Sequence, residues 1–257
     1  MSVFTTEIAS DSLPSDNPIH QRLLKAYVLA ADRVQGDVLE VGCGEGRGID
    51  WLLPKVTSLA AIDKIDTIID GLKKKYPQVA FTSDFIPPFK PYADNSFDWV
   101  VSFQVIEHIE DDHFYLKEIH RVLKPGGRAL ITTPNRPMSL SRNPWHVREY
   151  TGAELATLAQ NYFADVAMKG IGGNEKVMAY YQQNKQAVDR LMRWDVLNLQ
   201  HKLPAWMLRV PYEILNRRNR NGLNGQANEL VLNITHHDYL LQQDATDALD
   251  LFLEVRK

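Results

Sequence analysis

Short apolar runs alternate with amphipathic segments along most of the chain. The runs that have the length of buried strands are residues 37–42, 59–63, 79–81, 97–102, 128–133, 164–171 and 249–255. In the segments before and between the first five runs, apolar residues recur every three or four positions, as they do on one face of a helix. These helical segments are residues 19–34, 49–53, 65–76 and 110–122. The alternation predicts an α/β fold with a seven-stranded, mostly parallel, doubly wound sheet.

A long stretch, residues 173–246, separates the last two predicted strands and far exceeds an ordinary loop. Aromatic and aliphatic residues at helical spacing predict a helical insertion there, serving as a cap over a pocket or as a dimer contact. Residues 216–228, rich in Asn, Arg and Gly, are predicted to be a flexible loop with solvated arginines. The expected division is an N-terminal arm and helix (1–36, with 1–16 mobile), a core (37–172), the insertion (173–246) and a final strand (247–257).

Composition and charge restrict the classes of partner that the chain could bind. The chain has 257 residues, a formal net charge of -3 and one cysteine. A near-neutral charge gives no long-range attraction to nucleic acid or to an anionic membrane. One cysteine excludes a disulfide within the chain, and neither a bilayer-spanning run nor a signal-peptide pattern is found. We expect a soluble, cytoplasmic protein with no nucleic-acid or membrane partner, either a monomer or a homodimer.

The first predicted strand runs into a glycine-rich turn, Glu40-Val41-Gly42-Cys43-Gly44-Glu45-Gly46. Glycine lets the backbone turn tightly and lets a ligand approach without meeting a Cβ. The helix that follows offers unpaired N–H groups and the positive end of its dipole. The dinucleotide fingerprint G-x-G-x-x-G fails in every register, because its third glycine falls on Arg47, Ile49 or Trp51. The turn therefore predicts a ligand site of another type.

Five motifs in order resemble those of the class I S-adenosylmethionine-dependent methyltransferases. They are residues 39–46, Ile62-Asp63, Ser83-Asp84-Phe85, residues 97–102 with 105–109, and residues 122–127. The resemblance implies a Rossmann-like core, S-adenosyl-L-methionine as cofactor, and methyl transfer to oxygen or nitrogen of a small-molecule acceptor, a metabolite or a glycan-related compound. The alternatives are a nicotinamide-dependent oxidoreductase and a non-catalytic S-adenosylmethionine-binding or scaffold protein.

The resemblance also implies the cofactor residues. Asp63 would accept hydrogen bonds from both ribose hydroxyls, and Asp84 from the adenine amino group beside Phe85. Glu40 would balance the cofactor ammonium through a water. The full set is Tyr27, Glu40, Gly42, Cys43, Gly44, Gly46, Asp63, Lys64, Asp84, Phe85, Phe103 and Gln104. The structural alternatives are a helix N-cap for Asp63, a surface acid for Asp84 and core packing for Tyr27. Cys43 is not expected to be a nucleophile, since no histidine is near it in sequence.

Glu107 and His108 follow the fourth strand and are candidate catalytic residues, with helix capping and packing as the alternative. In relatives with a Glu-x-x-Glu-His pattern these groups bind a divalent metal. Here the segment Gln104-Val105-Ile106-Glu107-His108 lacks the first carboxylate, and loss of a charged oxygen ligand weakens a magnesium site. We therefore expect no metal.

The segment 143–151 precedes a helix that Thr151 and Glu154 should open with a capping box. It resembles a His-x-Arg-Glu-[Tyr/Phe]-Thr segment of bacterial family members that act on small molecules or glycans. His146 is the best candidate base, although methyl transfer requires a base only when the acceptor must lose a proton. The alternative is a structural loop in which His146, Arg148 and Glu149 form salt bridges.

Overall fold

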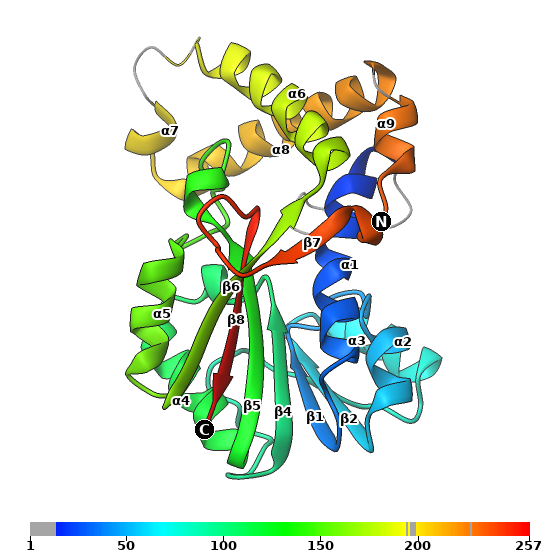
Figure 1. The fold of residues 1–257 in the computed structure, drawn as a ribbon, viewed down its shortest axis with the longest axis vertical. Coiled ribbons are helices and arrows are strands. Elements are labelled where there is room, and N and C mark those ends of the chain that lie inside the picture. Colours follow the sequence, from blue (N-terminus) through cyan, green and yellow to red (C-terminus); the bar gives the residue numbers. More distant parts are fainter. Residues whose placement is uncertain (1–13, 194, 196–198, 227) are drawn as a thin grey trace.

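The computed structural model describes residues 14–257 except 194, 196–198 and 227. Eight strands form one sheet in the order β3-β2-β1-β4-β5-β8-β6-β7 (Figure 1). Their bounds are β1 Asp37–Val41, β2 Ser58–Asp63, β3 Ala80–Ser83, β4 Phe97–Phe103, β5 Leu123–Pro134, β6 Asp165–Gly173, β7 Tyr239–Gln242 and β8 Asp250–Arg256. Strands β1 to β5 pair in parallel, whereas β8, β6 and β7 pair antiparallel. The predicted mostly parallel Rossmann-like sheet is confirmed, but it has one strand more, because β7 lies inside the predicted helical insertion.

Helices cover both faces of the sheet, so the fold has two apolar cores. One face carries α1 Asn17–Ala31, α2 Ile49–Leu52 and α3 Asp66–Lys75, and the other carries α4 Asp112–Val122 and α5 Gly152–Gln160. Successive side chains of a strand point to opposite faces, and β1 follows this rule: Val38 belongs to the first core, and Leu39 and Val41 to the second. The predicted doubly wound arrangement is therefore confirmed.

The capping box predicted before α5 is present. The Thr151 side chain accepts from the backbone N–H of Glu154, and the Glu154 carboxylate accepts from the N–H of Thr151 at 2.8 Å. Two of the orphan donors at the helix start are thereby satisfied. This fixes the direction in which the chain leaves residues 143–151.

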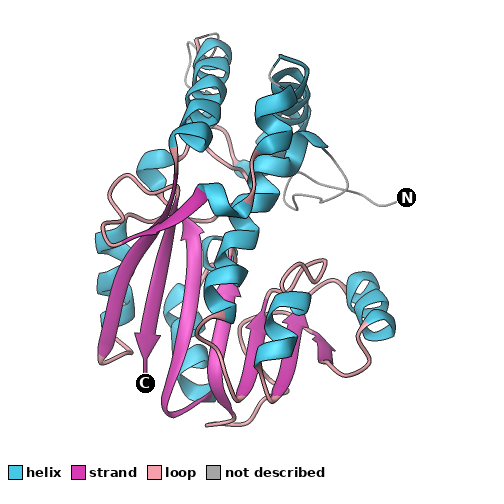
Figure 2. Ribbon diagram, turned by 45° about the vertical axis from the view of Figure 1, so that its right-hand side comes forward, coloured by secondary structure: helices cyan, strands magenta, loops and turns pink. Residues whose placement is uncertain are grey.

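In the chain, four helices lie between β6 and β7. They stand above the carboxyl edge of the sheet, where Figure 2 shows them as two columns. They are α6 Glu175–Met192, α7 Leu199–Lys202, α8 Ala205–Gln226 and α9 Asn228–Asn233, here called the cap. The predicted loop at 216–228 is wrong, since α8 is helical to Gln226. Within the described part of the chain, no helix is long and apolar enough to cross a bilayer.

Residues 15–17 pack against the cap and hydrogen-bond to it. Ser15 and Asp16 are buried, so the predicted mobile arm is wrong for these two residues; positions 1–13 lie outside the described ones. Asp16 Oδ1 accepts from Arg217 at 2.8 Å and from Arg220 at 3.2 Å, so these arginines are not solvated as predicted. The Asn17 side chain donates to two carbonyls of the α9 region. The cap and α1 are thus packed as one unit.

Asn135 provides a test of how the end of β5 is fixed. Its buried amide lies within hydrogen-bonding distance of the carbonyls of Ala245, Thr246 and Ala248. Asn135→Ala should lower the free energy of unfolding by about 1–3 kcal/mol, because buried carbonyls lose their donor. Asn161→Ala, which removes an exposed amide from two helix carbonyls, should cost less than half of that. Urea unfolding of both variants measures the difference, and equal losses would contradict the assignment.

Candidate functional site

A cleft of about 540 Å³ opens at the carboxyl ends of β1, β2 and β4. Open α/β sheets bind ligands at this edge, where the chain leaves adjacent strands toward opposite faces. Most of the residues predicted to bind the cofactor line the cleft: Tyr27, Gly42, Cys43, Gly44, Gly46, Asp63, Lys64, Phe85, Phe103 and Gln104. Glu40 and Asp84 are not among the lining residues. The structure thus brings together residues from four separate motifs.

The glycine turn presents bare backbone to the cleft. Gly42, Gly44 and Gly46 have φ of +77°, +49° and +79°, which L side chains rarely adopt. A Cβ at Gly42 would lie 2.3 Å from Val105 Cγ2, and one at Gly46 would lie 2.6 Å from Leu72 Cδ2. A Cβ at Gly44 would meet nothing within 4 Å. Two glycines are therefore demanded by packing, whereas Gly44 leaves space that a ligand on the backbone can fill.

Asp63 ends β2 beside this turn. Its Oδ2 accepts from the N–H of Gly44 at 2.9 Å, and its Oδ1 accepts from the N–H of Ile65 at 3.2 Å. A carboxylate can accept about four hydrogen bonds, so each oxygen keeps a free lone pair. Helix α3 begins at Asp66 with Ile65 in the N-cap position, so the alternative role of Asp63 as its N-cap is wrong. The turn orients the carboxylate and leaves it able to accept more.

Glu40 lies behind the turn, fully buried. Its Oε1 accepts from the Tyr27 hydroxyl at 2.8 Å, and the Tyr27 ring packs edge-on against Phe103 with centroids 4.8 Å apart. Burial raises the pKa of Glu40 to about 7, partly offset by the Tyr27 hydrogen bond. Tyr27 therefore packs in the core and lines the cleft at once, and Glu40 can act on a ligand only through intervening groups.

Asp84 and Phe85 are neighbours in the chain, but only Phe85 lines the cleft. The Asp84 Oδ1 accepts from the N–H of Phe85 at 2.8 Å, and Oδ2 lies 4.0 Å from Lys90 Nζ. Phe85 is 74% exposed and lines the cleft. Asp84 thus orders its own turn, while the Phe85 ring offers an open apolar surface at the rim.

Cys43 lines the cleft but is not chemically activated. It is 3% exposed, and burial followed by the charge of Glu40 raises the pKa of its thiol. Reactive cysteines have a lowered pKa, since the thiolate is the nucleophile. The environment of Cys43 is consistent with the expectation that it is no nucleophile.

A second pocket of about 260 Å³ adjoins the cleft, and Leu23, Gln104 and His108 line both. Gln104 has φ of +59°, and its side chain lies within hydrogen-bonding distance of the Thr132 hydroxyl. A non-glycine residue in the left-handed region costs free energy and persists only where the surroundings hold it. Gln104 is thus held in a strained conformation at the junction of the two cavities.

Candidate acids and bases gather at one end of this second pocket. The pocket is lined there by Glu107, His108, His146 and Glu149. The Glu149 Oε1 accepts from His146 Nδ1 at 2.6 Å, and the rings of His146 and His108 lie 5.0 Å apart. Glu107 is buried and accepts from the Thr133 hydroxyl at 3.0 Å. Burial raises the pKa of Glu107 to about 7, and the nearby charge of His146 opposes this rise.

These groups could also approach a metal ion. Glu107, His108 and His146 each offer a ligand atom, and these atoms lie within 4.8 Å of one another. However, His108 Nδ1 lies 2.9 Å from the Trp145 carbonyl, and His146 Nε2 lies 2.8 Å from the Asn143 amide nitrogen. A metal at His146 would have to displace that amide donor.

The structural alternative for the 143–151 segment holds in part. His146 Nδ1 hydrogen-bonds to Glu149, but Arg148 pairs with Asp112 on α4 instead of joining them. The cap also contacts this segment, since Arg209 of α8 stacks over Trp145 at 4.2 Å. The segment is therefore clamped between α4 and the cap, with His146 directed to the pocket.

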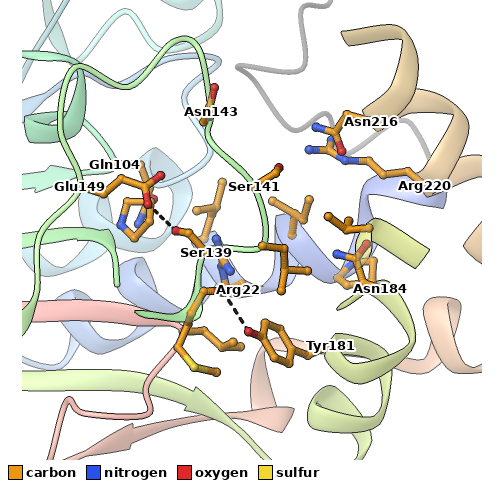
Figure 3. Close-up of a pocket in the computed structure, with 18 of the residues that line it drawn as sticks. Arg22, Gln104, Ser139, Ser141, Asn143, Glu149, Tyr181, Asn184, Asn216 and Arg220 are labelled. Carbon is orange, nitrogen blue, oxygen red and sulfur yellow. Dashed lines mark hydrogen bonds between the residues drawn. The ribbon is translucent and has the colours of Figure 1, made fainter. Parts of the chain in front are cut away.

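The opposite end of the second pocket was not predicted. Figure 3 shows Arg220 there, with Asn184 and Asn216 from the cap helices, and Arg22 near the centre of the pocket. The α8 residues that line it are Tyr212, Asn216, Asn219 and Arg220, which share one helix face. This spacing of Tyr, Asn and Arg was visible in the sequence, but the predicted loop assignment hid it.

Comparisons with known proteins agree with this geometry. Residues 39–131 match a family model described as a methyltransferase domain. A protein of Mycolicibacterium smegmatis, described as a probable S-adenosylmethionine-dependent methyltransferase, is 37% identical over 61% of this chain and 63% of its own length. A similarly described protein of Mycobacterium tuberculosis is 39% identical over 52% of this chain and 51% of its own length. The chain thus spans less than two thirds of these relatives.

A solved structure extends the likeness in fold to nearly the whole chain. The S-adenosylmethionine-dependent methyltransferase structure from Thermotoga maritima superposes with a TM-score of 0.58, covering 93% of this chain and 91% of the other. Sequence identity is only 13%, so this likeness concerns the fold alone.

The buried glutamates predict how stability depends on pH. Folded Glu40 holds its proton up to about pH 7, whereas an unfolded glutamate releases it near pH 4.5. The folded state therefore binds more protons between these values, and stability falls as pH rises through this window. Glu40→Gln keeps an acceptor for Tyr27 and removes the ionisation. Relative to the wild type, the variant should gain about 1 kcal/mol of stability between pH 6 and pH 9.

Urea unfolding at the two pH values measures this gain. The matched control is Glu110→Gln, which changes an exposed residue and should leave the pH dependence as it is. A Glu40→Gln variant whose stability relative to the wild type is the same at both pH values would contradict the shifted pKa.

Proposed function

Because the chain contains a class I S-adenosylmethionine-dependent methyltransferase domain, we propose that it transfers a methyl group to a small-molecule acceptor held in the second pocket. One observation carries this proposal: the two cavities meet at Gln104 and His108, so a donor and an acceptor would face each other. The pocket volume, about 260 Å³, is near the lower end of the range for small-molecule sites. We propose oxygen or nitrogen as the accepting atom.

The lining residues fit the cofactor. The free lone pairs of Asp63 suit the two ribose hydroxyls, and the open space at Gly44 suits the methionine portion lying against the backbone. The Phe85 ring suits one face of the adenine. Glu40 would favour the cofactor ammonium through the field of its carboxylate rather than by contact. Asp84 is the weakest of the assigned residues, because its carboxylate already orders its own turn.

When bound, S-adenosylmethionine supplies an activated methyl group whose leaving group is a neutral thioether. The protein's main contribution is then to hold the acceptor atom in line, and such positioning alone can lower a barrier by several kcal/mol. The strained Gln104 and the clamped 143–151 segment are the rigid elements around this point.

His146 is the proposed base for an acceptor that must lose a proton. Glu149 accepts the hydrogen bond from Nδ1, which leaves Nε2 as the basic atom. The Asn143 amide lies next to Nε2, and an acceptor hydroxyl would take its place. Glu107 and His108 complete the group, with Glu107 close to half ionised near pH 7. This cluster offers a proton acceptor without a metal, and we propose that none is required.

Calorimetry with S-adenosylhomocysteine and with NAD tests the cofactor. We expect binding of S-adenosylhomocysteine alone, and binding of NAD alone would refute the proposal. Asp63→Ala should abolish binding while the fold is retained. Gly44→Ala should weaken binding by at least about tenfold, since its Cβ enters the cleft.

The matched control for Gly44→Ala is Gly126→Ala. Gly126 also has a positive φ, +79°, a Cβ there would meet nothing nearer than Arg256 Nη2 at 3.7 Å, and it does not line the cleft. Undiminished affinity in Gly44→Ala, or an equal loss in both variants, would count against the assigned site.

Turnover of His146→Ala tests the base. A panel of small hydroxyl and amine compounds, assayed by release of S-adenosylhomocysteine, first identifies an acceptor. With a hydroxyl acceptor, His146→Ala should lower kcat by roughly a hundredfold or more and leave S-adenosylhomocysteine affinity unchanged. His113→Ala is the control, because His113 is exposed on α4 and lines neither cavity. Near-normal kcat in His146→Ala would leave positioning as the mechanism.

A further inference from the structure

The second pocket has a chemical asymmetry that the proposed methyl transfer does not use. Carboxylates and histidines line its end near the cofactor cleft, and two arginines, Arg22 and Arg220, line the remainder. In Figure 3, Arg22 lies near the centre of the pocket, and Arg220 reaches in from the side where Asn184 and Asn216 lie. An acceptor bound here would experience positive charge at a distance from its reacting atom.

Arg220 is almost completely buried, with a side chain that is 9% exposed. A buried charge is costly unless it is paired. Its Nη1 donates to Asp16 Oδ1 at 3.2 Å, which is its one hydrogen bond to a described residue. A guanidinium has five N–H donors in a planar fork, so most of the hydrogen-bonding capacity of Arg220 is available to something in the pocket.

Arg22 also has an N–H donor that makes no hydrogen bond to a described residue. Its Nε lies 3.2 Å from Asp250 Oδ2, but this Nε makes no hydrogen bond with proper geometry. The side chain is 25% exposed and lines the pocket. Within the described residues, the Arg22 fork is thus neutralised in charge by Asp250 but not satisfied in hydrogen bonding.

The charges of the described residues around this end do not balance. Asp16, which is fully buried, is shared by Arg217 and Arg220, and Asp250 is paired with Arg22. The Arg22–Asp250 pair is neutral, whereas the single carboxylate of Asp16 faces two guanidinium groups, which leaves one positive charge in excess in that cluster. The buried Tyr180 hydroxyl belongs to the same group: burial raises its pKa, and the charges of Arg220 and Arg22 oppose this rise.

We propose that Arg220 and Arg22 form an anion subsite, which binds a carboxylate or phosphate group of the acceptor while its accepting atom lies at the His146 end. This assignment rests on the proposed function and narrows its substrate class to anionic small molecules. An oxyanion would neutralise the excess charge and occupy the open donors, and bidentate contacts of this kind are among the strongest hydrogen bonds. The amides of Asn184 and Asn216 line the same end.

The chain provides a matched pair of variants. Arg220→Gln removes a pocket-lining guanidinium, whereas Arg217→Gln removes the other partner of Asp16, which is not among the residues that line the pocket. If the arginines only neutralise Asp16, the two substitutions should behave alike. If Arg220 binds an anion, only its substitution should affect that binding. Arg220→Lys keeps the charge without the fork and should restore binding only in part.

The experiment measures binding of inorganic phosphate and of malonate to the full chain saturated with S-adenosylhomocysteine, by calorimetry at constant ionic strength. Wild-type protein should bind at least one of them, and which one binds distinguishes a phosphate-bearing acceptor from a carboxylate-bearing one. Affinity for that anion should fall by about tenfold or more in Arg220→Gln and by less than twofold in Arg217→Gln. Arg22→Gln is the second test and should lower the affinity for the same anion.

Three outcomes would overturn the anion subsite: no binding of either anion, equal losses in Arg220→Gln and Arg217→Gln, or unchanged affinity in Arg220→Gln. The affinity for S-adenosylhomocysteine is measured in every variant and should stay within twofold of the wild type. Absence of that binding in the wild-type chain refutes the proposed function. Its presence without anion binding refutes the subsite alone.

Discussion

The parallel pairing of β1 with β4 is the constraint on which the rest of the structure depends. The two strands lie side by side, but the chain leaves β1 toward the face of α2 and leaves β4 toward the face of α4. Their carboxyl ends therefore diverge and open a crevice. At its base the two ends are close enough that a Cβ at Gly42 would lie 2.3 Å from Val105. The cleft is a consequence of this divergence.

Buried acids mark the boundary between scaffold and site. Glu40 lies behind the cleft and Glu107 lines the second pocket, and burial raises the pKa of each to about 7. Such groups cost stability in their charged form, so they are seldom retained for packing alone. Each is reached by a single hydroxyl donor, Tyr27 or Thr133. The fold thus holds two buried carboxyl groups where a cationic ligand and a proton transfer are proposed.

The sequence predicted the parts of the fold in which local pattern and tertiary structure agree. The glycines of the first turn need positive φ, and the capping box at Thr151 acts within one helical turn, so both could be read from a few residues. The assignment of Asp63 to the site followed from the resemblance of its motif, and Asp63 does line the cleft. Whether these residues bind a cofactor stays a prediction, because a residue that lines a cleft is not thereby shown to bind a ligand.

The cap could not be predicted in this way. Asn, Arg and Gly favour turns in isolation, yet α8 continues through them because Asn219 bonds to Asn184 of α6 and Arg217 and Arg220 reach the buried Asp16. Tertiary contacts overrode local propensity. Strand β7 is four residues long and has one buried tyrosine, too short for a pattern to stand out. The arginine end of the pocket was missed for the same reason, since it depends on partners about 200 positions away.

Those distant partners also set the order in which the molecule is completed during synthesis. Arg220 meets Asp16 across 204 positions, and the Tyr239 hydroxyl donates to the Pro18 carbonyl across 221. Contacts of such separation close late, because a long loop must first lose its entropy. A nascent chain that has passed Pro134 already carries β1 to β5, whereas the second pocket still awaits the cap helices α6 to α9. The two halves of the site are therefore completed at different times during synthesis, the glycine turn before the pocket that faces it.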